Sequence, residues 1–282
     1  MEGECDHIVF DAAFRTARRM RLNDNGFIRR AVTAVPPLEH WLHEQWNMRQ
    51  HLVPADELLV AYGQALDYLA QRHGPDGVGD YLEFGVFRGE SMLCMQQALE
   101  AAGLSRVRMI GFDSFEGLPE SIEPGDTAMR AEGGVPWKPQ SFNSTYEATR
   151  RALTKGGVQW DRTVLVKGWY DETLVPEMRQ QLGLSSIGVV MVDCVLYSST
   201  RLALAFCGPL ITDEAVFVFD DWGAGEVAEH NLGEKAAFEE FLAEHPEFAA
   251  HDIGGYIHSQ QAVPTEARMF AVQRRPTPDA GA

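Results

Sequence analysis

Short apolar runs alternate with helix-like stretches along this chain from Asp80 onward. Five of the runs have the length of a buried strand: Tyr81–Phe84, Val107–Phe112, Thr163–Val166, Ile187–Val192 and Ala215–Phe219. Helical patterns cover Ser91–Ala102, Ser144–Leu153, Thr173–Leu182, Ser199–Leu210 and Glu234–Glu244. Near-continuous apolar strands that alternate with helices are typical of a parallel sheet covered on both faces. The pattern therefore predicts a doubly wound α/β fold.

The domain boundaries follow from where this alternation begins and ends. Residues 1–78 read as an N-terminal helical cap, 79–273 as the α/β domain and 274–282 as a flexible tail. Within the domain, 121–143 is rich in Gly, Pro and charge and carries no period. A segment of that length without secondary structure is usually functional or disordered, so we expect a mobile lid loop there. After it, Ser144 and Glu147 fit a capping box that opens a helix.

The charge balance excludes several kinds of partner. The 282 residues carry 41 Asp and Glu against 24 Lys and Arg, a net charge of −17. Nucleic acids and anionic lipids both bind clusters of basic residues, so we expect neither as a partner. No apolar run approaches the ~20 residues that a membrane span requires. The four cysteines lack C-x-x-C spacing, which favours reduced thiols in a cytoplasmic protein. The sequence leaves open whether the protein forms a homo-oligomer.

Two strand ends carry residues suited to a nucleoside-type cofactor. Ligands of open parallel sheets bind beyond the carboxyl ends of the strands. After the first run, Gly85 permits a sharp turn, and Gly89 allows a close approach to the backbone at the start of the next helix. Glu83 supplies an acceptor for an ammonium or hydroxyl group. Asp113, past the second run, can accept from both hydroxyls of a ribose. Glu83 alone fits a solvated turn equally well, but a ribose site without G-x-G-x-x-G favours S-adenosylmethionine.

Three aspartates follow two further strands. Asp193 ends one apolar run, and Asp220 and Asp221 end the next. If these strands are adjacent, their carboxylates share one sheet edge and repel unless a cation lies among them. Oxygen-only ligands favour Mg²⁺ or another hard divalent cation. Each aspartate alone fits a helix cap, but the set predicts a metal site that orients substrate oxygens.

Five sequence blocks in this order resemble the macrocin O-methyltransferase family. They are LEFGVFRG (82–89), FDSFEGLP (112–119), KGWY (167–170), VDCVLYSST (192–200) and FDDW (219–222). The resemblance runs from about Asp80 to Phe270. It implies a class I S-adenosylmethionine-dependent enzyme with a seven-stranded, mostly parallel Rossmann-like sheet. Many family members methylate sugar hydroxyls during antibiotic biosynthesis.

The resemblance also implies roles for individual residues. Glu83 and Gly85 would line the methionine end of the cofactor, and Asp113 would hold its ribose. The other expected cofactor residues are Gly89, Ser91, Ser114, Gly168 and Trp169, the last three near the adenine. Asp193, Asp220 and Asp221 would bind Mg²⁺.

One position departs from the family pattern. Family members usually read D-x-D-L-Y at the fourth strand, where the second aspartate is a candidate general base, but this chain has Val195. Neighbouring Cys194 reads as a buried small residue rather than a thiolate base. A base from elsewhere is one explanation, with His230, His258 and His251 as candidates. An acidic acceptor such as a phenol or enol, a changed reaction, and an engineered or inactive variant stay open as well.

The function we expect is S-adenosylmethionine-dependent, divalent-metal-assisted O-methyl transfer to a hydroxyl of a small, glycosylated natural product. The alternatives are a methyltransferase fold that serves a lyase, isomerase or pericyclase, and a binding role without catalysis. Val195 motivates the first alternative, because general-base assistance contributes about 10²–10⁴-fold to a rate.

Overall fold

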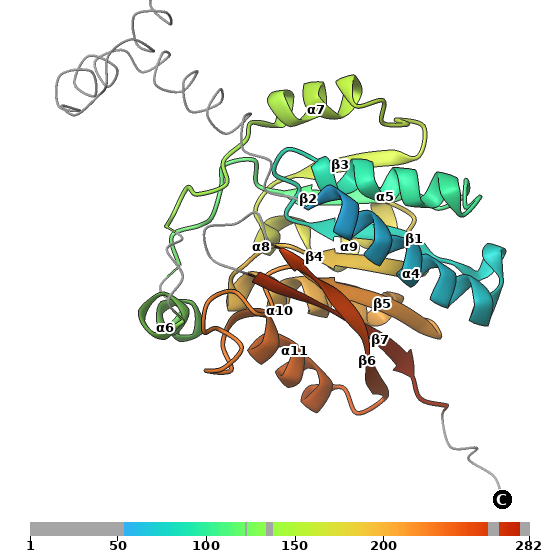
Figure 1. Ribbon diagram of the computed structural model, residues 1–282. Helices are drawn as coiled ribbons and strands as arrows, with labels where there is room; N and C mark the ends of the chain where they lie inside the picture. Colours follow the sequence, from blue (N-terminus) through green and yellow to red (C-terminus); the bar gives the residue numbers. More distant parts are fainter. Residues whose placement is uncertain (1–53, 122, 134–137, 259–264, 277–282) are drawn as a thin grey trace, which may run out of the picture. The chain divides into compact units, whose positions relative to one another are not determined.

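A seven-stranded sheet forms the centre of the computed structural model, which describes residues 54–121, 123–133, 138–258 and 265–276 (Figure 1). The strand order is β3-β2-β1-β4-β5-β7-β6. All neighbours pair in parallel except β7, which runs antiparallel to β5 and β6. The strands are β1 (Asp80–Phe84), β2 (Met109–Asp113), β3 (Thr163–Lys167), β4 (Ile187–Val192), β5 (Glu214–Phe219), β6 (Phe248–His258) and β7 (Thr265–Arg274). The predicted doubly wound fold is confirmed, and each predicted run forms a strand.

Eight α-helices lie in the described part of the chain. They are α4 (Ala55–His73), α5 (Glu90–Ala101), α6 (Pro124–Glu132), α7 (Tyr146–Lys155), α8 (Tyr170–Thr173), α9 (Pro176–Gln181), α10 (Tyr197–Cys207) and α11 (Gly233–Glu244). Short 3₁₀ turns cover Pro75–Gly77 and Gly208–Leu210. The helix expected over Thr173–Leu182 begins three residues later as α9, because Pro176 cannot continue a helix but starts one well, and Thr173 instead ends the short helix α8.

Two local expectations differ from the structure. The segment expected as a loop, 121–143, contains helix α6. The predicted capping box is wrong, because Thr145 rather than Ser144 caps α7 and accepts from the Ala148 N–H at 3.2 Å. The Ser144 hydroxyl instead bonds the hydroxyl of Thr149 at 3.0 Å.

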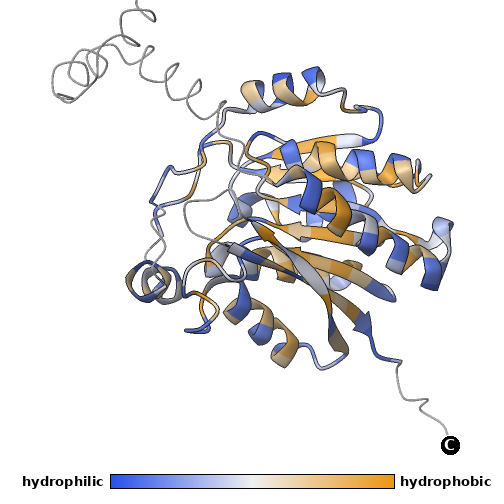
Figure 2. Cartoon of the chain, in the orientation of Figure 1, coloured by the Kyte–Doolittle hydropathy of each residue, from blue (hydrophilic) through white to orange (hydrophobic). Residues whose placement is uncertain are grey.

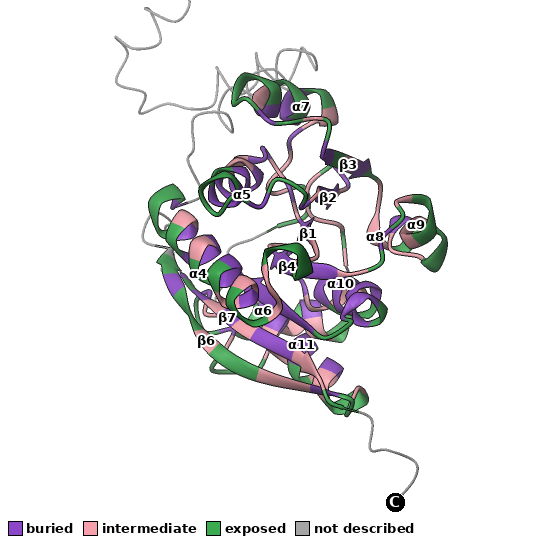
Figure 3. Ribbon diagram, turned by 90° about the vertical axis from the view of Figure 1, so that its right-hand side faces the viewer, coloured by how far each residue is buried: buried purple, intermediate pink, exposed green. Residues whose placement is uncertain are grey.

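The strands bury both faces, as their apolar sequences predict. On one face, Tyr81 packs in a core with α4 and α5, and on the other, Leu82 and Phe84 pack in a core with α10 and α11. Figure 2 shows the apolar strands between helices whose outer sides are hydrophilic, and Figure 3 shows the same contrast as burial. Because neighbouring residues of a strand face opposite ways, Glu83 shares the α4 and α5 face with Tyr81.

Helix α4 belongs to the segment expected as an N-terminal cap. Its apolar stripe, which includes Leu58, Tyr62, Leu66 and Leu69, is buried in the same core as β1. Residues 1–53 of that segment and 277–282 of the expected tail lie outside the described residues. Among the described residues, no helix is both long and apolar enough to cross a bilayer.

The register of the parallel strands decides where the site forms. Phe84 of β1 is level with Val192 of β4, and Val192 is level with Phe219 of β5. The residues that follow these three strands therefore leave the sheet side by side. They are Gly85, Asp193 and Asp220.

Candidate active site

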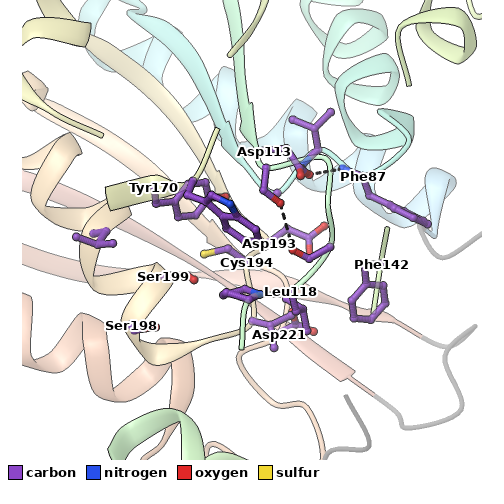
Figure 4. A pocket seen from close by; sticks show the side chains of 18 of the residues that line it. Phe87, Asp113, Leu118, Phe142, Tyr170, Asp193, Cys194, Ser198, Ser199 and Asp221 are labelled. Atoms are coloured by element: carbon purple, nitrogen blue, oxygen red, sulfur yellow. Dashed lines mark hydrogen bonds between the residues drawn. The ribbon is translucent and has the colours of Figure 1, made fainter. Parts of the chain in front are cut away.

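A cavity of about 480 Å³ lies at the carboxyl ends of the parallel strands. Its walls come from the segments that follow β1, β2, β3, β4 and β5. Figure 4 shows Asp113, Asp193 and Asp221 around it, with Phe87 and Phe142 on one side and Tyr170 on the other. This volume and position are those of a small-molecule site in an open α/β sheet.

Gly85 and Gly89 shape the first turn as the sequence predicts. Gly85 has φ +94°, and a Cβ there would lie 1.8 Å from the carbonyl oxygen of Asp193, so only glycine lets β1 and β4 end so close together. Gly89 caps α5 in a left-handed conformation, where a Cβ would meet the Leu153 side chain at 2.5 Å. Gly85 lines the cavity, whereas Gly89 supports the turn from outside it.

Asp113 lines the cavity and also ties two of its loops together. Its Oδ2 accepts the N–H groups of Val86 and Phe87, both at 2.8 Å, and its Oδ1 accepts the N–H of Phe115 at 2.6 Å. Burial raises the pKa of this carboxyl, and the three N–H donors partly offset that shift. Because a carboxylate oxygen has two acceptor positions, Oδ1 has one further position beside its bond to the Phe115 N–H.

Glu83 does not line the cavity, in contrast to what the resemblance implies. It is fully buried beneath the turn, where its Oε1 accepts from the Ser91 hydroxyl at 2.6 Å and its Oε2 accepts from the Tyr81 hydroxyl. Burial raises its pKa to about 8. Ser91 does line the cavity, so its hydroxyl links Glu83 to the cavity wall.

Two of the three residues expected near the adenine line the cavity. Ser114 and Trp169 line the cavity, whereas Gly168 does not. Gly168 instead donates its N–H to the Asp113 carbonyl at 3.0 Å, which anchors the turn that presents Trp169.

The three predicted aspartates converge. Each of Asp193, Asp220 and Asp221 offers a carboxylate oxygen within 4.8 Å of the others, since β4 and β5 are neighbours as predicted. Burial and mutual repulsion raise the pKa values of Asp193 and Asp221 well above the usual range. Asp220 also accepts from the hydroxyl of Tyr256 on β6. A divalent cation fits this all-oxygen set, because it would remove the repulsion among buried carboxylates.

Sequence reasoning missed a fourth carboxylate beside this cluster. Glu234, in the first turn of α11, is 1% exposed and accepts the N–H of Asp221 at 3.1 Å. Its pKa is raised well above the usual range by burial and by the aspartates. The sequence placed it at the start of a helix, but only the packing of α11 shows that it is buried.

Val195 lines the cavity in a strained backbone conformation. Its φ is +64°, which is rare for a β-branched residue and typical of functional sites when it occurs. Its side chain packs with Met129, Leu196 and Val227, so an apolar patch lies where the family pattern has a carboxylate. Cys194 is buried and its pKa is raised, mainly by burial, which agrees with its interpretation as a small packing residue.

Two of the candidate histidines, His230 and His251, are not brought into the cavity. His230 is exposed, lies 3.3 Å from Glu226, and is absent from the lining. His251 is exposed on β6. His258 ends β6 opposite Thr265, and its side chain is outside the described part of the chain. The geometry does not support His230 as the general base.

Helix α6 is fastened to the cavity wall by a buried aspartate. Asp126, which is fully buried, accepts from the N–H and hydroxyl of Ser198 at 3.1 and 2.6 Å and from the hydroxyl of Ser121. Ser121 and Ser198 both line the cavity. The segment expected as a lid is therefore tied to the first turn of α10 in this structure.

Comparison with known proteins identifies the family. A family model described as Macrocin-O-methyltransferase (TylF) matches residues 64–243. The chain belongs to this family. The match ends inside α11 and includes the turn after β1, the aspartate cluster and α6.

Two curated relatives agree with the family assignment. The 8-demethyl-8-(2,3-dimethoxy-alpha-L-rhamnosyl)-tetracenomycin-C 4'-O-methyltransferase of Streptomyces olivaceus is 31% identical over 163 residues, which cover 56% of this chain and 58% of the relative. The mycinamicin III 3''-O-methyltransferase of Micromonospora griseorubida is 25% identical over 150 residues, which cover 52% and 57%. The chain thus spans somewhat more than half the length of each relative.

Solved structures of O-methyltransferases share the fold. NovP superposes with a TM-score of 0.56 at 20% identity over 77% of this chain and 79% of that one. TomG from Streptomyces achromogenes, involved in tomaymycin synthesis and solved in complex with SAM, gives 0.50 at 16% identity over 95% and 96%. The predicted class I methyltransferase fold is confirmed.

Proposed function

We propose that this protein transfers the methyl group of S-adenosylmethionine to a sugar hydroxyl of a small natural product, with the help of a divalent cation. The observation that carries the proposal is the meeting of the turn after β1, Asp113 and the three-aspartate cluster in one cavity. Family membership supports the transfer reaction, and the names of both curated relatives support a hydroxyl on a glycosylated compound.

The residues of the cavity fall into two groups, one that would hold the cofactor and one that would hold the cation. Asp113, Ser114 and Trp169 would hold the nucleoside, and the Ser91 hydroxyl, oriented by Glu83, would meet the methionine end. Asp193, Asp220 and Asp221 would hold the cation beside the acceptor. When bound, S-adenosylmethionine supplies an electrophilic methyl group, and the cation supplies positive charge that lowers the pKa of a hydroxyl.

The transfer needs the acceptor and the methyl donor in line and shielded from water. Leu118 and Phe142 line the cavity and belong to the segments on either side of α6. Packed against the cluster that contains Met129 and Val195, they would exclude water from the reacting groups. The methyl group would pass to the acceptor oxygen, the hydroxyl proton would leave, and S-adenosylhomocysteine would be released.

Incubation with methyl-labelled S-adenosylmethionine, Mg²⁺ and a set of glycosylated acceptors tests the reaction. We expect S-adenosylhomocysteine and labelled product to form in equal amounts. Conversion of an acceptor without S-adenosylhomocysteine would overturn the proposal and support a lyase, isomerase or pericyclase instead. The apolar wall at Val195 is the observation that favours that second function.

Replacement of Val195 tests how the acceptor loses its proton. We expect Val195→Asp to raise kcat by about 10²-fold, the lower range of general-base assistance. Aspartate also tolerates the left-handed backbone better than valine does. Val195→Asn is the matched control, because it relieves the same strain without adding a base. Equal rates for the two variants, or a loss of rate in Val195→Asp alone, would show that the cavity does not use a base at this position.

A further inference from the structure

Glu234 is a buried carboxylate that takes no part in lining the cavity. It lies in the first turn of α11, a helix of 12 residues. Its Oε2 accepts the N–H of Asp221 at 3.1 Å, and its Oε1 has no hydrogen-bond partner. Buried polar atoms without partners are rare in folded proteins, so this oxygen calls for an explanation.

The hydrogen bond to Asp221 has a specific consequence for the aspartate cluster. The N–H that Glu234 accepts belongs to the peptide bond that joins Asp220 to Asp221. Fixing this peptide fixes the backbone from which both carboxylates project. A neutral acceptor would hold the N–H as well, so the bond explains the position of the side chain but not its charge.

The charge of Glu234 is unfavourable unless positive charge lies nearby. Its carboxyl group is buried and bonded to the backbone of Asp221, so its charge would add to that of three other carboxylates close by. The N-terminus of α11 offsets a part of this, since helix N-termini favour negative charge. A divalent cation among the aspartates would offset far more, because two opposite charges attract strongly in a buried site.

We propose that Glu234 is a positioning residue for the cation site. It holds the peptide between Asp220 and Asp221, and its negative charge raises the affinity of the cluster for a divalent cation. The inference rests on the proposed metal site and adds to it a residue from outside the cavity. Groups in this position typically change metal affinity by about 10–100-fold.

Isothermal titration calorimetry of the purified full chain with Mn²⁺ tests the proposal. Glu234→Gln keeps the acceptor for the Asp221 N–H but removes the charge, and we expect about tenfold weaker Mn²⁺ binding. Glu234→Leu removes both, and we expect about 100-fold weaker binding. Glu239→Gln is the matched control, because Glu239 is an exposed glutamate of the same helix, and its Mn²⁺ affinity should equal that of the unaltered protein.

Thermal unfolding without a cation separates positioning from general structural support. Glu234→Gln should unfold no earlier than the unaltered protein, because it keeps the acceptor for the Asp221 N–H, yet gain less stability from Mn²⁺. If Glu234→Leu does not fold, Glu234→Gln still decides the question. Equal Mn²⁺ affinity in Glu234→Gln and the unaltered protein overturns the role of the Glu234 charge, and equal affinity in Glu234→Leu overturns its positioning role. Failure of the unaltered protein to bind Mn²⁺ overturns the metal site itself.

Discussion

Asp220→Asn is expected to lower the rate of methyl transfer by about 10³-fold and to remove its dependence on a divalent cation. Asp220 is buried, and one of its carboxylate oxygens lies within 4.8 Å of a carboxylate oxygen of Asp193 and of Asp221. The hydroxyl of Tyr256 orients the Asp220 side chain. Charge stabilisation by a bound cation contributes several kcal/mol, and about 4 kcal/mol corresponds to a thousandfold change in rate. Initial rates measured over a range of Mg²⁺ concentrations give both quantities.

Asp213→Asn is the control for this experiment. Asp213 is an exposed aspartate just before β5, at the end of the strand opposite Asp220. Its replacement should leave the rate and the Mg²⁺ dependence unchanged. If Asp220→Asn keeps the Mg²⁺ dependence of the unaltered protein, the cation acts elsewhere and the metal site is wrongly assigned.

The metal-free protein is expected to lose stability as the pH rises from about 5 to about 8. Glu83 has its pKa raised from 4.5 to about 8 by burial, so the folded state holds its proton more tightly than the unfolded state. Between these two pH values the unfolded chain binds fewer protons, and the free energy of unfolding therefore falls. At about 1.4 kcal/mol per pKa unit, Glu83 accounts for a loss of a few kcal/mol.

Urea unfolding at pH 5, 6, 7, 8 and 9 measures this loss. Glu83→Gln cannot titrate and should flatten the decline. The raised pKa values of Asp193 and Asp221 act in the same direction, and Mg²⁺ should remove their share but not that of Glu83. A free energy of unfolding that stays constant or rises over this range, without metal, would contradict the prediction.

Residues at strand ends were the most predictable part of the site. Asp193, Asp220 and Asp221 follow strands that are recognisable as apolar runs, and parallel strands bring such residues to one edge. Glu83 shows the limit of this reasoning. It belongs to the right strand, but the alternation of side chains turns it toward α4 and α5 and away from the cavity.

The supporting residues could not be predicted because they depend on packing between distant segments. Glu234 reaches Asp221 from α11, and Tyr256 reaches Asp220 from β6, 36 residues along the chain. Asp126 lies in a segment without periodicity, and only the structure shows that it caps the start of α10. In the sequence, each of these residues is one acidic or aromatic residue among many.

The bonds between Asp126 and Ser198 set a free-energy cost for lifting α6 away from the first turn of α10. Lifting α6 would break two hydrogen bonds to a charged acceptor, each of which contributes about 1.5–3 kcal/mol. At that free energy, the lifted form would make up about 1% of the molecules or less. If the contents of the cavity exchange only when α6 lifts, ligand entry and product release both wait for this rare form. This gate would limit the number of catalytic cycles per second even if the methyl transfer itself were fast.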